Sequence, residues 1–584
     1  MGYWFVAPYT YIHSPEERME YSPCQIGPHI YDQDGQLVWA GSCQENNRNV
    51  FDFRPYQFGD EVRLSFAYLP HPSARIFPLG YGVLMDSTFN LTHRIPSIEY
   101  EMPYGKSTWG SFAFNAHEWR ITDGGTRAVF LSTYFEDAKL LDGPAPLGDT
   151  ANDETGYIQH ENLIELDLAS GTAEFTWWPL HQGVQANETQ LVRASGEHHD
   201  EISHQTKPSW DVLHSNSIAV TSEHDFIFSA RHMSTVFKVS RQTGAILWRL
   251  GGRLSSFTQD FTFSFQHNVE VVSENSDVTV IALLDNASND AGIPGQTANV
   301  SSVKIIALNT QTWTATLLRQ IDRPDQGLSR LRGNAQTLVN GNILAAWSDQ
   351  GYMTEHDPDG NMVMEARFSS SRFSTYRAYK AAFVGRPTEP PAMRAVRYVA
   401  LGSRGAHVTT VVYVSWNGAT EVREWRLWGL KKGVWVDAGV VQKDGFETVV
   451  TLVGAWEQMY VEGLDGAGVV LGRSRIQVLA DKSGEISVDL ATDTLQDMDV
   501  VDAGVVEDQD QDEEETDVAA AAWAQRGYGD EGVGFGGHAH GGLTCGQSYL
   551  MPLVMFTVVQ VFLVLGWQSF IRGRTGHFRQ VSYT

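Results

Sequence analysis

Polar and apolar positions follow a short phrase that occurs four times along the chain. Each copy has a polar head residue, an aliphatic residue four positions later, and a polar turn that leads into a short apolar strand. Strand units of this kind cannot bury their apolar faces alone, so they must stack or close around an axis. In a closed arrangement the four head residues converge on that axis. The copies are His117–Ile121, His214–Ile218, His267–Val271 and Asn334–Leu338.

A second repeat lies between these copies and consists of two apolar runs joined by a tight polar turn. Asp-Gly, Ser-Gly and Thr-Gly turns between alternating runs are hairpin signals. Six such hairpins, each preceded by an inner strand, predict an all-β six-bladed β-propeller over residues 1–375. We place the inner strands of the first two blades at Tyr3–Ala7 and Glu61–Ala67. A parallel β-helix is disfavoured, because its periods would be shorter and more regular. The hairpins are Ile30–Trp39, Leu84–Leu91, Ile164–Trp177, Val236–Trp248, Val303–Trp313 and Met353–Val363.

The pattern changes after the propeller. A proline-rich boundary at Arg386–Pro391 precedes alternating strands, which predict an immunoglobulin- or fibronectin-like β-sandwich over residues 376–485. An acidic run and a glycine-rich stretch follow, and their composition predicts a disordered stalk over residues 486–547.

An uncharged apolar run, Tyr549–Ile571, is long enough to span a bilayer and predicts a transmembrane helix at residues 548–572. A short basic tail, residues 573–584, follows it. The positive-inside rule then places the C-terminus in the cytoplasm and the bulk of the chain in the lumen or outside the cell. No leader with a basic region and an apolar core opens the sequence. We therefore expect that the natural chain starts further upstream; the alternative is a tail anchor with a cytosolic body.

Composition limits the cellular compartments and the classes of partner that are compatible with this sequence. Lys and Arg number 42 and Asp and Glu 70, a net charge of −28, which argues against a nucleic-acid partner. Cys24 and Cys43 flank the first hairpin and either form a disulfide in an oxidising compartment or remain buried thiols. Four Asn-x-Ser/Thr triplets fit a glycoprotein of the secretory pathway; they begin at Asn90, Asn187, Asn286 and Asn299.

The head residues are the strongest candidates for chemistry. If the blades close, His117, His214 and His267 share one polar cluster at the mouth of the channel. Arg231 ends the strand after the His214 phrase and reaches the same zone. The alternative is a channel lined with polar groups that bind only water. No carboxylate recurs with the histidines at fixed spacing, so we expect no metal and no other cofactor. Asn216, Asn334 and Gln336 complete the cluster, whereas His160 is interpreted as a surface residue.

At these residues the chain resembles the arylsulfotransferase family, in its fungal branch. The resemblance runs over about residues 3–480 and is carried by the motifs His117–Gly124, Asp211–Ile218, Ser229–Arg231, Thr243–Gly252, Phe265–Asn268, Leu284–Asn286, Gly333–Gln336 and Val414–Val422. It implies a propeller enzyme that moves a sulfuryl group from a phenolic sulfate ester to a phenol without a nucleotide donor. The partners are then a small phenolic donor and a small phenolic acceptor, besides the membrane.

The resemblance also implies a role for each head residue. His267 matches a nucleophile that forms a sulfohistidine, and His214, Asn216 and Arg231 match a sulfate-binding group. His117 matches a further active-site histidine, and Asn334 and Gln336 are expected to contact substrate. Two other functions remain open: a non-catalytic propeller that binds a ligand or a protein, and a quinoprotein-like oxidoreductase, which would need a calcium site.

Overall fold

The computed structural model is all-β, and it describes residues 2–9, 25–45, 49–68, 81–96, 113–137, 157–191, 209–288, 295–348, 351–402, 405–479, 486–488 and 578–582. The helical turns in this part of the chain are short 3₁₀ turns: η1 (Asp123–Gly125), η3 (Pro179–His181) and η4 (Ala186–Glu188).

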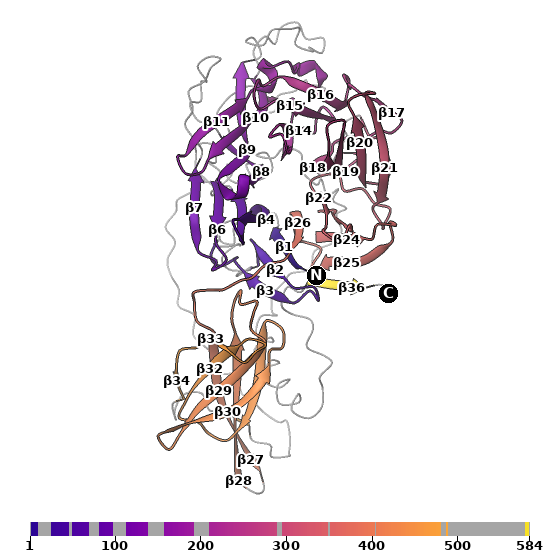
Figure 1. Cartoon of the computed structure of the whole chain (residues 1–584). Helices are drawn as coiled ribbons and strands as arrows, with labels where there is room; N and C mark the ends of the chain where they lie inside the picture. Colours follow the sequence, from indigo (N-terminus) through magenta and orange to yellow (C-terminus); the bar gives the residue numbers. More distant parts are fainter. Residues whose placement is uncertain are drawn as a thin grey trace, which may run out of the picture.

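Six sheets of four antiparallel strands stand in a circle, each forming one blade (Figure 1). From the axis outward, blade 1 consists of β26 (Ser374–Ala381), β1 (Tyr3–Tyr9), β2 (His29–Tyr31) and β3 (Leu37–Ala40). Blade 2 consists of β4 (Val50–Phe58), β5 (Glu61–Tyr68), β6 (Tyr81–Met85) and β7 (Leu91–Pro96). Blade 3 consists of β8 (Ala113–Thr122), β9 (Arg127–Asp137), β10 (Tyr157–Asp167) and β11 (Thr172–Trp177). The axial strands of consecutive blades contact one another all the way round. This arrangement is a β-propeller.

Blades 4 to 6 continue the circle. Blade 4 consists of β13 (Ser215–Val220), β14 (Phe226–Ala230), β15 (Thr235–Val239) and β16 (Ile246–Gly251). Blade 5 consists of β18 (His267–Glu274), β19 (Val278–Asp285), β20 (Ser302–Asn309) and β21 (Thr314–Asp322). Blade 6 consists of β22 (Asn334–Thr337), β23 (Ile343–Ala346), β24 (Tyr352–His356) and β25 (Met362–Phe368). Three short strands extend these sheets: β12 (Ser209–Asp211) beside β10, β17 (Thr258–Gln259) beside β21, and β36 (Phe578–Ser582) beside β25.

Apolar packing between neighbouring blades holds the circle together. One buried cluster fills each of the six interfaces. In β1, Trp4 and Val6 pack toward blade 6, whereas Phe5 and Ala7 pack toward blade 2. Because successive side chains of a strand point to opposite faces, a strand buried on both faces is apolar without interruption. The sequence of β1 is therefore a continuous apolar run.

The closure of the circle corrects the predicted inner strands. β26 follows blade 6 in sequence, yet it forms the axial strand of blade 1 and pairs with β1. The expected inner strands Tyr3–Ala7 and Glu61–Ala67 are the second strands of blades 1 and 2. The ring also extends to Ala381, past the predicted boundary at residue 375. In blade 1 the axial strand comes from the far end of the propeller sequence, whereas in blade 2 it is β4, which directly precedes the expected inner strand.

Bulges in the axial strands aim polar side chains into the centre. The pairing register of β4, β8, β13 and β18 shifts at residues 51–54, 115–119, 215–217 and 267–270. A bulge places an extra residue on one strand and redirects its neighbours. His117 and Glu118 are consecutive, and both are buried among polar partners near the axis.

Residues after the propeller form two further sheets that share one apolar cluster, which includes Val412, Trp425 and Val461. The sheets consist of β27 (Ala392–Gly402), β28 (Gly405–Ser415), β31 (Glu447–Val453) and β35 (Ile486–Val488), and of β29 (Glu424–Lys431), β30 (Val434–Gln442), β32 (Gln458–Leu464), β33 (Val470–Arg473) and β34 (Gln477–Val478). Asn417 and Gly418 bond the backbone of Ala40 and Val38 in blade 1. An immunoglobulin- or fibronectin-like sandwich remains a prediction for this unit.

Several predictions fall wholly or partly outside the described residues. Most of the stalk, the span at 548–572 and Cys24 lie there, while Cys43 is disulfide-bonded. In the part of the chain that the structure describes, no helix has the length and apolarity needed to cross a membrane. β36, from the predicted basic tail, pairs with β25 of blade 6. The predicted membrane topology stays a prediction.

Candidate active site

The three histidine heads lie together at one end of the channel. His117 belongs to β8, His214 precedes β13, and His267 opens β18. The imidazole centroids of His117 and His214 are 5.0 Å apart. His267 and Arg231 interact electrostatically with this pair. Neighbouring blades thus bring together the four residues that the sequence nominated for catalysis.

Hydrogen bonds fix the tautomer of His267. The backbone N–H of Arg332 donates to its Nε2 at 3.2 Å, so Nε2 carries a lone pair. Nδ1 lies 2.8 Å from Oδ1 of Asn286, whose own amide nitrogen donates to the carbonyl oxygens of Ser329 and Arg332. Nδ1 therefore carries the proton and donates it. Asn286 was missed as an orienting residue, although it ends the motif Leu284–Asn286.

Burial and the neighbouring Arg231 guanidinium hold the pKa of His267 well below its usual range. His267 is only 2% exposed. A buried imidazole beside a fixed cation stays neutral, because its charged form loses hydration and is repelled. The unprotonated Nε2 is consequently available as a nucleophile near neutral pH.

The Nδ1 atom of His214 has a carboxylate partner, Asp211. Asp211 Oδ2 lies 2.5 Å from Nδ1 of His214, and Oδ1 accepts the backbone N–H of His214 at 2.9 Å. The backbone of His214 has φ of +45°, a left-handed conformation that is strained for a non-glycine residue. An imidazole held by a carboxylate at Nδ1 exchanges protons through Nε2.

His117 is oriented by Asn115, two residues before it. Oδ1 of Asn115 accepts the backbone N–H of His117 at 3.0 Å and lies 2.6 Å from Nδ1. Burial, followed by the nearby His214 and His267, holds the pKa of His117 well below its usual range. His117 is therefore neutral, with Nδ1 as its donor.

Arg231 is fully buried between the histidines and the next blade. Its Nη1 donates to Nε2 of His232 at 2.9 Å, and its guanidinium lies 5.4 Å from the ring centroid of Phe265. His232 Nδ1 in turn donates to the carbonyl oxygen of Asp211. Asp211, His214 and His232 are close enough to be considered for a metal ion. His232 is unsuited to bind a metal ion, because the lone pair of its Nε2 accepts the hydrogen bond from Arg231, and the positive charge of Arg231 would repel a cation.

Three residues expected to bind substrate form hydrogen bonds between neighbouring blades. Asn334 bonds the backbone N–H and carbonyl of Ala378 with its two amide atoms, and Gln336 bonds Lys380 in the same way. Asn216 donates to the carbonyl of Gln266 and accepts the N–H of Asn268, the residues that flank His267. Asn216 thus positions the backbone on both sides of His267, and the contact of these three residues with substrate stays a prediction.

Two further predictions need correction. Asn286 is fully buried and its amide nitrogen donates to two carbonyls, so a glycan on that nitrogen is incompatible with this structure. Asn90 and Asn299 are exposed, and Asn187 is half-buried. His160 is not a surface residue: it is fully buried in β10, with its imidazole 5.3 Å from the ring of Tyr134.

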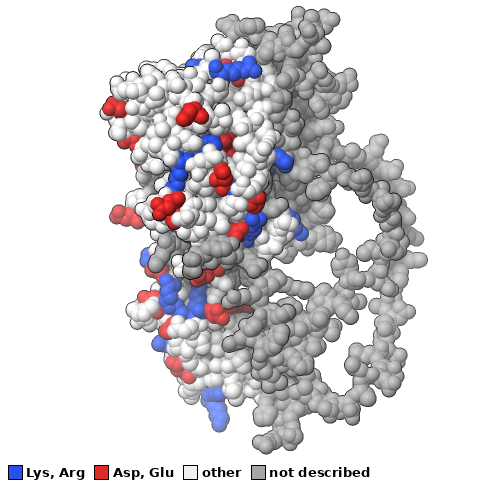
Figure 2. Space-filling view, turned by 90° about the vertical axis from the view of Figure 1, so that its right-hand side faces the viewer, with Lys and Arg blue, Asp and Glu red and all other residues white. Residues whose placement is uncertain are grey.

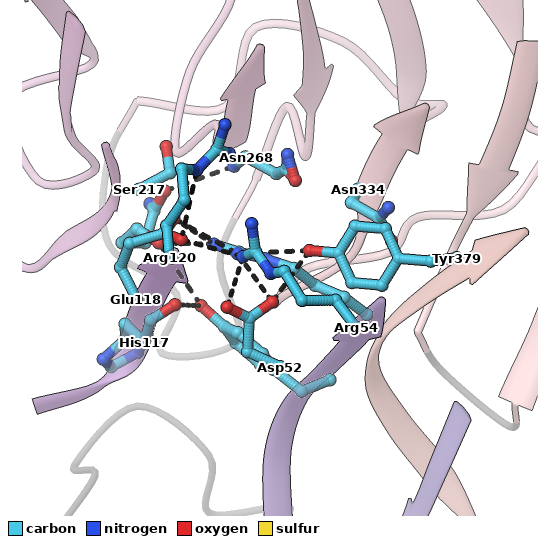
Figure 3. A network of polar contacts seen from close by, with 12 residues as sticks. Asp52, Arg54, His117, Glu118, Arg120, Ser217, Asn268, Asn334 and Tyr379 are labelled. Atoms are coloured by element: carbon cyan, nitrogen blue, oxygen red, sulfur yellow. Dashed lines mark hydrogen bonds and ion pairs between the residues drawn. The ribbon is translucent and has the colours of Figure 1, made fainter. Parts of the chain in front are cut away.

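A buried ionic network lies next to His117, among the axial strands (Figure 3). Asp52 and Glu118 accept hydrogen bonds from Arg54 and Arg377. Arg377 also donates to the carbonyl oxygen of Asn216 at 2.6 Å. The hydroxyl of Tyr376 donates to the carbonyl oxygen of His117 at 3.0 Å, as an extension of the same network. The backbone of two site residues therefore rests on this network.

One face of the described part of the molecule carries charged side chains of both signs (Figure 2). Figure 2 shows acidic and basic side chains interspersed over both the propeller and the second unit on the face it presents. Arg127, Arg241, Glu165 and Glu174, for example, form one group of ion pairs across blades 3 and 4.

Comparison with known proteins supplies the family. No curated protein matches the chain. Similar solved structures include the Dos1 propeller (9% identity, 61% of this chain and 73% of that chain, TM-score 0.28) and a streptogramin B lyase (8%, 63% and 80%, 0.26). Another is an auxiliary nutrient binding protein from Bacteroides ovatus (11%, 71% and 74%, 0.28). These TM-scores are too low to support an argument.

The family match agrees with the motifs. Residues 76–369 match the arylsulfotransferase (ASST) family, and this segment contains His117, His214, Arg231 and His267. The resemblance inferred from the motifs is confirmed, and the chain belongs to the arylsulfotransferase family.

Proposed function

We propose that this protein transfers a sulfuryl group from a phenolic sulfate ester to a phenol through a sulfohistidine on His267. The observation that carries the proposal is the fixed tautomer of His267, whose unprotonated Nε2 lies in a buried site beside Arg231. Family membership supports the reaction class, and the hydrogen bonds support the choice of nucleophile.

In the first half-reaction, Nε2 of His267 attacks sulfur and the bond between sulfur and the aryl oxygen breaks. The electron pair leaves with the phenoxide, which takes a proton from Nε2 of His214. Nδ1 of His267 keeps its proton on Asn286, so the product is a positively charged imidazolium that bears the sulfuryl group. The bond from the Arg332 N–H to Nε2 must give way as the nitrogen–sulfur bond forms.

In the second half-reaction, the acceptor phenol attacks sulfur and the nitrogen–sulfur bond breaks. Its electron pair returns to Nε2, and the phenol proton passes to His214, which Asp211 stabilises as an imidazolium. The guanidinium of Arg231 stabilises negative charge on the sulfuryl oxygens as sulfur passes through its transition state. One histidine thus carries the group and another carries the proton.

The test is to incubate the purified protein with an aryl sulfate and then with a phenol. Intact-mass analysis should show one sulfuryl adduct before the acceptor is added and none afterwards. His267→Ala should abolish the adduct, whereas His224→Ala, at a histidine with 55% of its side chain exposed, should retain it. Absence of adduct and turnover in the wild-type protein, with several donors, would favour the non-catalytic propeller.

A further inference from the structure

A buried glutamate, Glu161, lies behind the His214–Asp211 pair and was not among the sequence candidates. Glu161 belongs to β10, the third strand of blade 3, and is 1% exposed. Its Oε2 accepts the backbone N–H of Ser215 at 2.8 Å, directly after His214 in the chain. Burial of a carboxylate in a sheet costs free energy, so the buried position of Glu161 calls for an explanation.

The strand register explains why this carboxyl group faces the site. β12 pairs in parallel with β10, and Asp211 stands opposite Gln159. Glu161 lies two residues beyond Gln159 on the same face of β10, since side chains alternate along a strand. The carboxyl groups of Asp211 and Glu161 therefore point to the same side, toward His214 and Ser215. Together they fix the backbone of consecutive residues, at the N–H groups of His214 and Ser215.

We propose that Glu161 is a positioning residue for His214, and that the neighbouring carboxyl groups of Glu161 and Asp211 together carry one negative charge. The inference rests on the proposed function, because it concerns how readily His214 gives and accepts the proton that the proposed reaction transfers. Asp211 contacts the imidazole directly, while Glu161 acts through Asp211 and through the backbone of Ser215.

The electrostatics agree with this geometry. Burial and the neighbouring Asp211 carboxylate raise the pKa of Glu161 to about 8. The other charged or titratable groups of the described residues nearby include His214 from the turn before β13, His117 from β8, and Arg231 and His232, which directly follow β14. His160 lies on the opposite face of β10, against Tyr134. Two carboxyl groups in one buried site rarely ionise together.

The number of negative charges in the pair decides how His214 exchanges its proton. With one charge, Asp211 supports the imidazolium without trapping it, so His214 can give the proton to a phenoxide and accept one from a phenol. When Glu161 also ionises, a second negative charge holds the proton on His214 more tightly. His214 therefore stays protonated to a higher pH than it would beside one negative charge, and it can still give its proton to the departing phenoxide.

The first experiment is the pH profile of adduct formation from an aryl sulfate, because this half-reaction uses the protonated form of His214. In the wild-type protein, ionisation of Glu161 around pH 8 should keep His214 protonated and extend the rate to higher pH. Glu161→Gln keeps an oxygen acceptor for the Ser215 N–H but cannot supply this charge, so the alkaline limb should move downward by at least about one pH unit. An unmoved limb, or an equal loss of rate at every pH, would overturn the proposal.

A second experiment does not depend on activity. A carboxyl group whose pKa is higher in the folded than in the unfolded state stabilises the fold at low pH, and this contribution is lost as pH rises. The Tm of Glu161→Gln minus that of wild type should therefore increase from about pH 4.5 to about pH 8 and then level off. In an Asp211→Asn background this increase should end at a lower pH. A flat difference would contradict the carboxyl pair.

Glu462→Gln is the matched control, because Glu462 is also a buried glutamate but belongs to the second unit. It should leave the pH profile of adduct formation unchanged. If the wild-type protein does not transfer a sulfuryl group, the proposed function fails, while the Tm series still decides whether the carboxyl pair exists.

Discussion

Replacement of Glu118 by Gln should destabilise the propeller strongly, because it removes one charge from the buried network. Glu118 is fully buried; Oε1 accepts from Arg54 at 2.8 Å, and Oε2 accepts from Arg377 and from the N–H of Ile218 at 3.2 Å each. Loss of one partner from a buried ion pair costs about 3–5 kcal/mol. Asp52 still pairs with both arginines, so we expect the lower end of this range, about 3 kcal/mol.

The unfolding entropy converts this free energy into a temperature. At about 2.1 cal/mol/K per residue, a unit of roughly 380 residues unfolds with about 0.8 kcal/mol/K, so Tm should fall by about 4 °C. Calorimetry or circular dichroism of the full chain measures the change. The control is Glu421→Gln, which breaks an ion pair with Arg386 in which the two side chains are 38% and 68% exposed. An exposed pair is worth less than about 1 kcal/mol. Equal Tm shifts in the two variants would refute the assigned role of the network.

Three other predictions concern the site and the tail. Asn286→Ala should slow formation of the sulfuryl adduct at least about tenfold, measured by quenched-flow mass analysis, because Nδ1 of His267 loses its acceptor. The rate of adduct formation should stay the same between pH 7 and pH 6, because the lowered pKa keeps His267 neutral. A histidine with an ordinary pKa would lose rate over this interval, so a rate that halves near pH 6.5 would contradict the prediction. If β36 pairs with β25 in solution, a disulfide engineered between Ala366→Cys and Gln580→Cys should form, whereas a membrane-separated tail would leave both thiols free.

Turn chemistry and the head phrase predict the blades well, because both depend on residues near one another in sequence. Gly244, at a turn with φ of +71°, is a typical hairpin signal. The axial strand of blade 1 was not predictable in this way, since β26 reaches it from the end of the propeller. Which strand of a blade lies at the axis depends on partners that local periodicity does not reveal.

The site was predictable for side chains that act chemically and not for those that support them. His117, His214 and His267 are each introduced by the repeated phrase. Polar residues at the same positions also serve as bonds between blades, and Asn334 shows that residue type alone does not separate the two roles. Glu161 occupies a strand position where an apolar residue is normal, and only the register of β12 explains its burial.

Closure by β26 has a consequence for biosynthesis. Tyr3 pairs with Ala381, so almost the whole propeller must be synthesised after β1 before its axial neighbour exists. Until then, the apolar faces of blade 1 toward blade 6 have nothing to cover them, which makes a partly synthesised chain dependent on chaperones. The same pairing brings the two ends of the propeller sequence together. Joining them and opening the chain at another turn between blades should therefore yield a circular permutant with an unchanged active site.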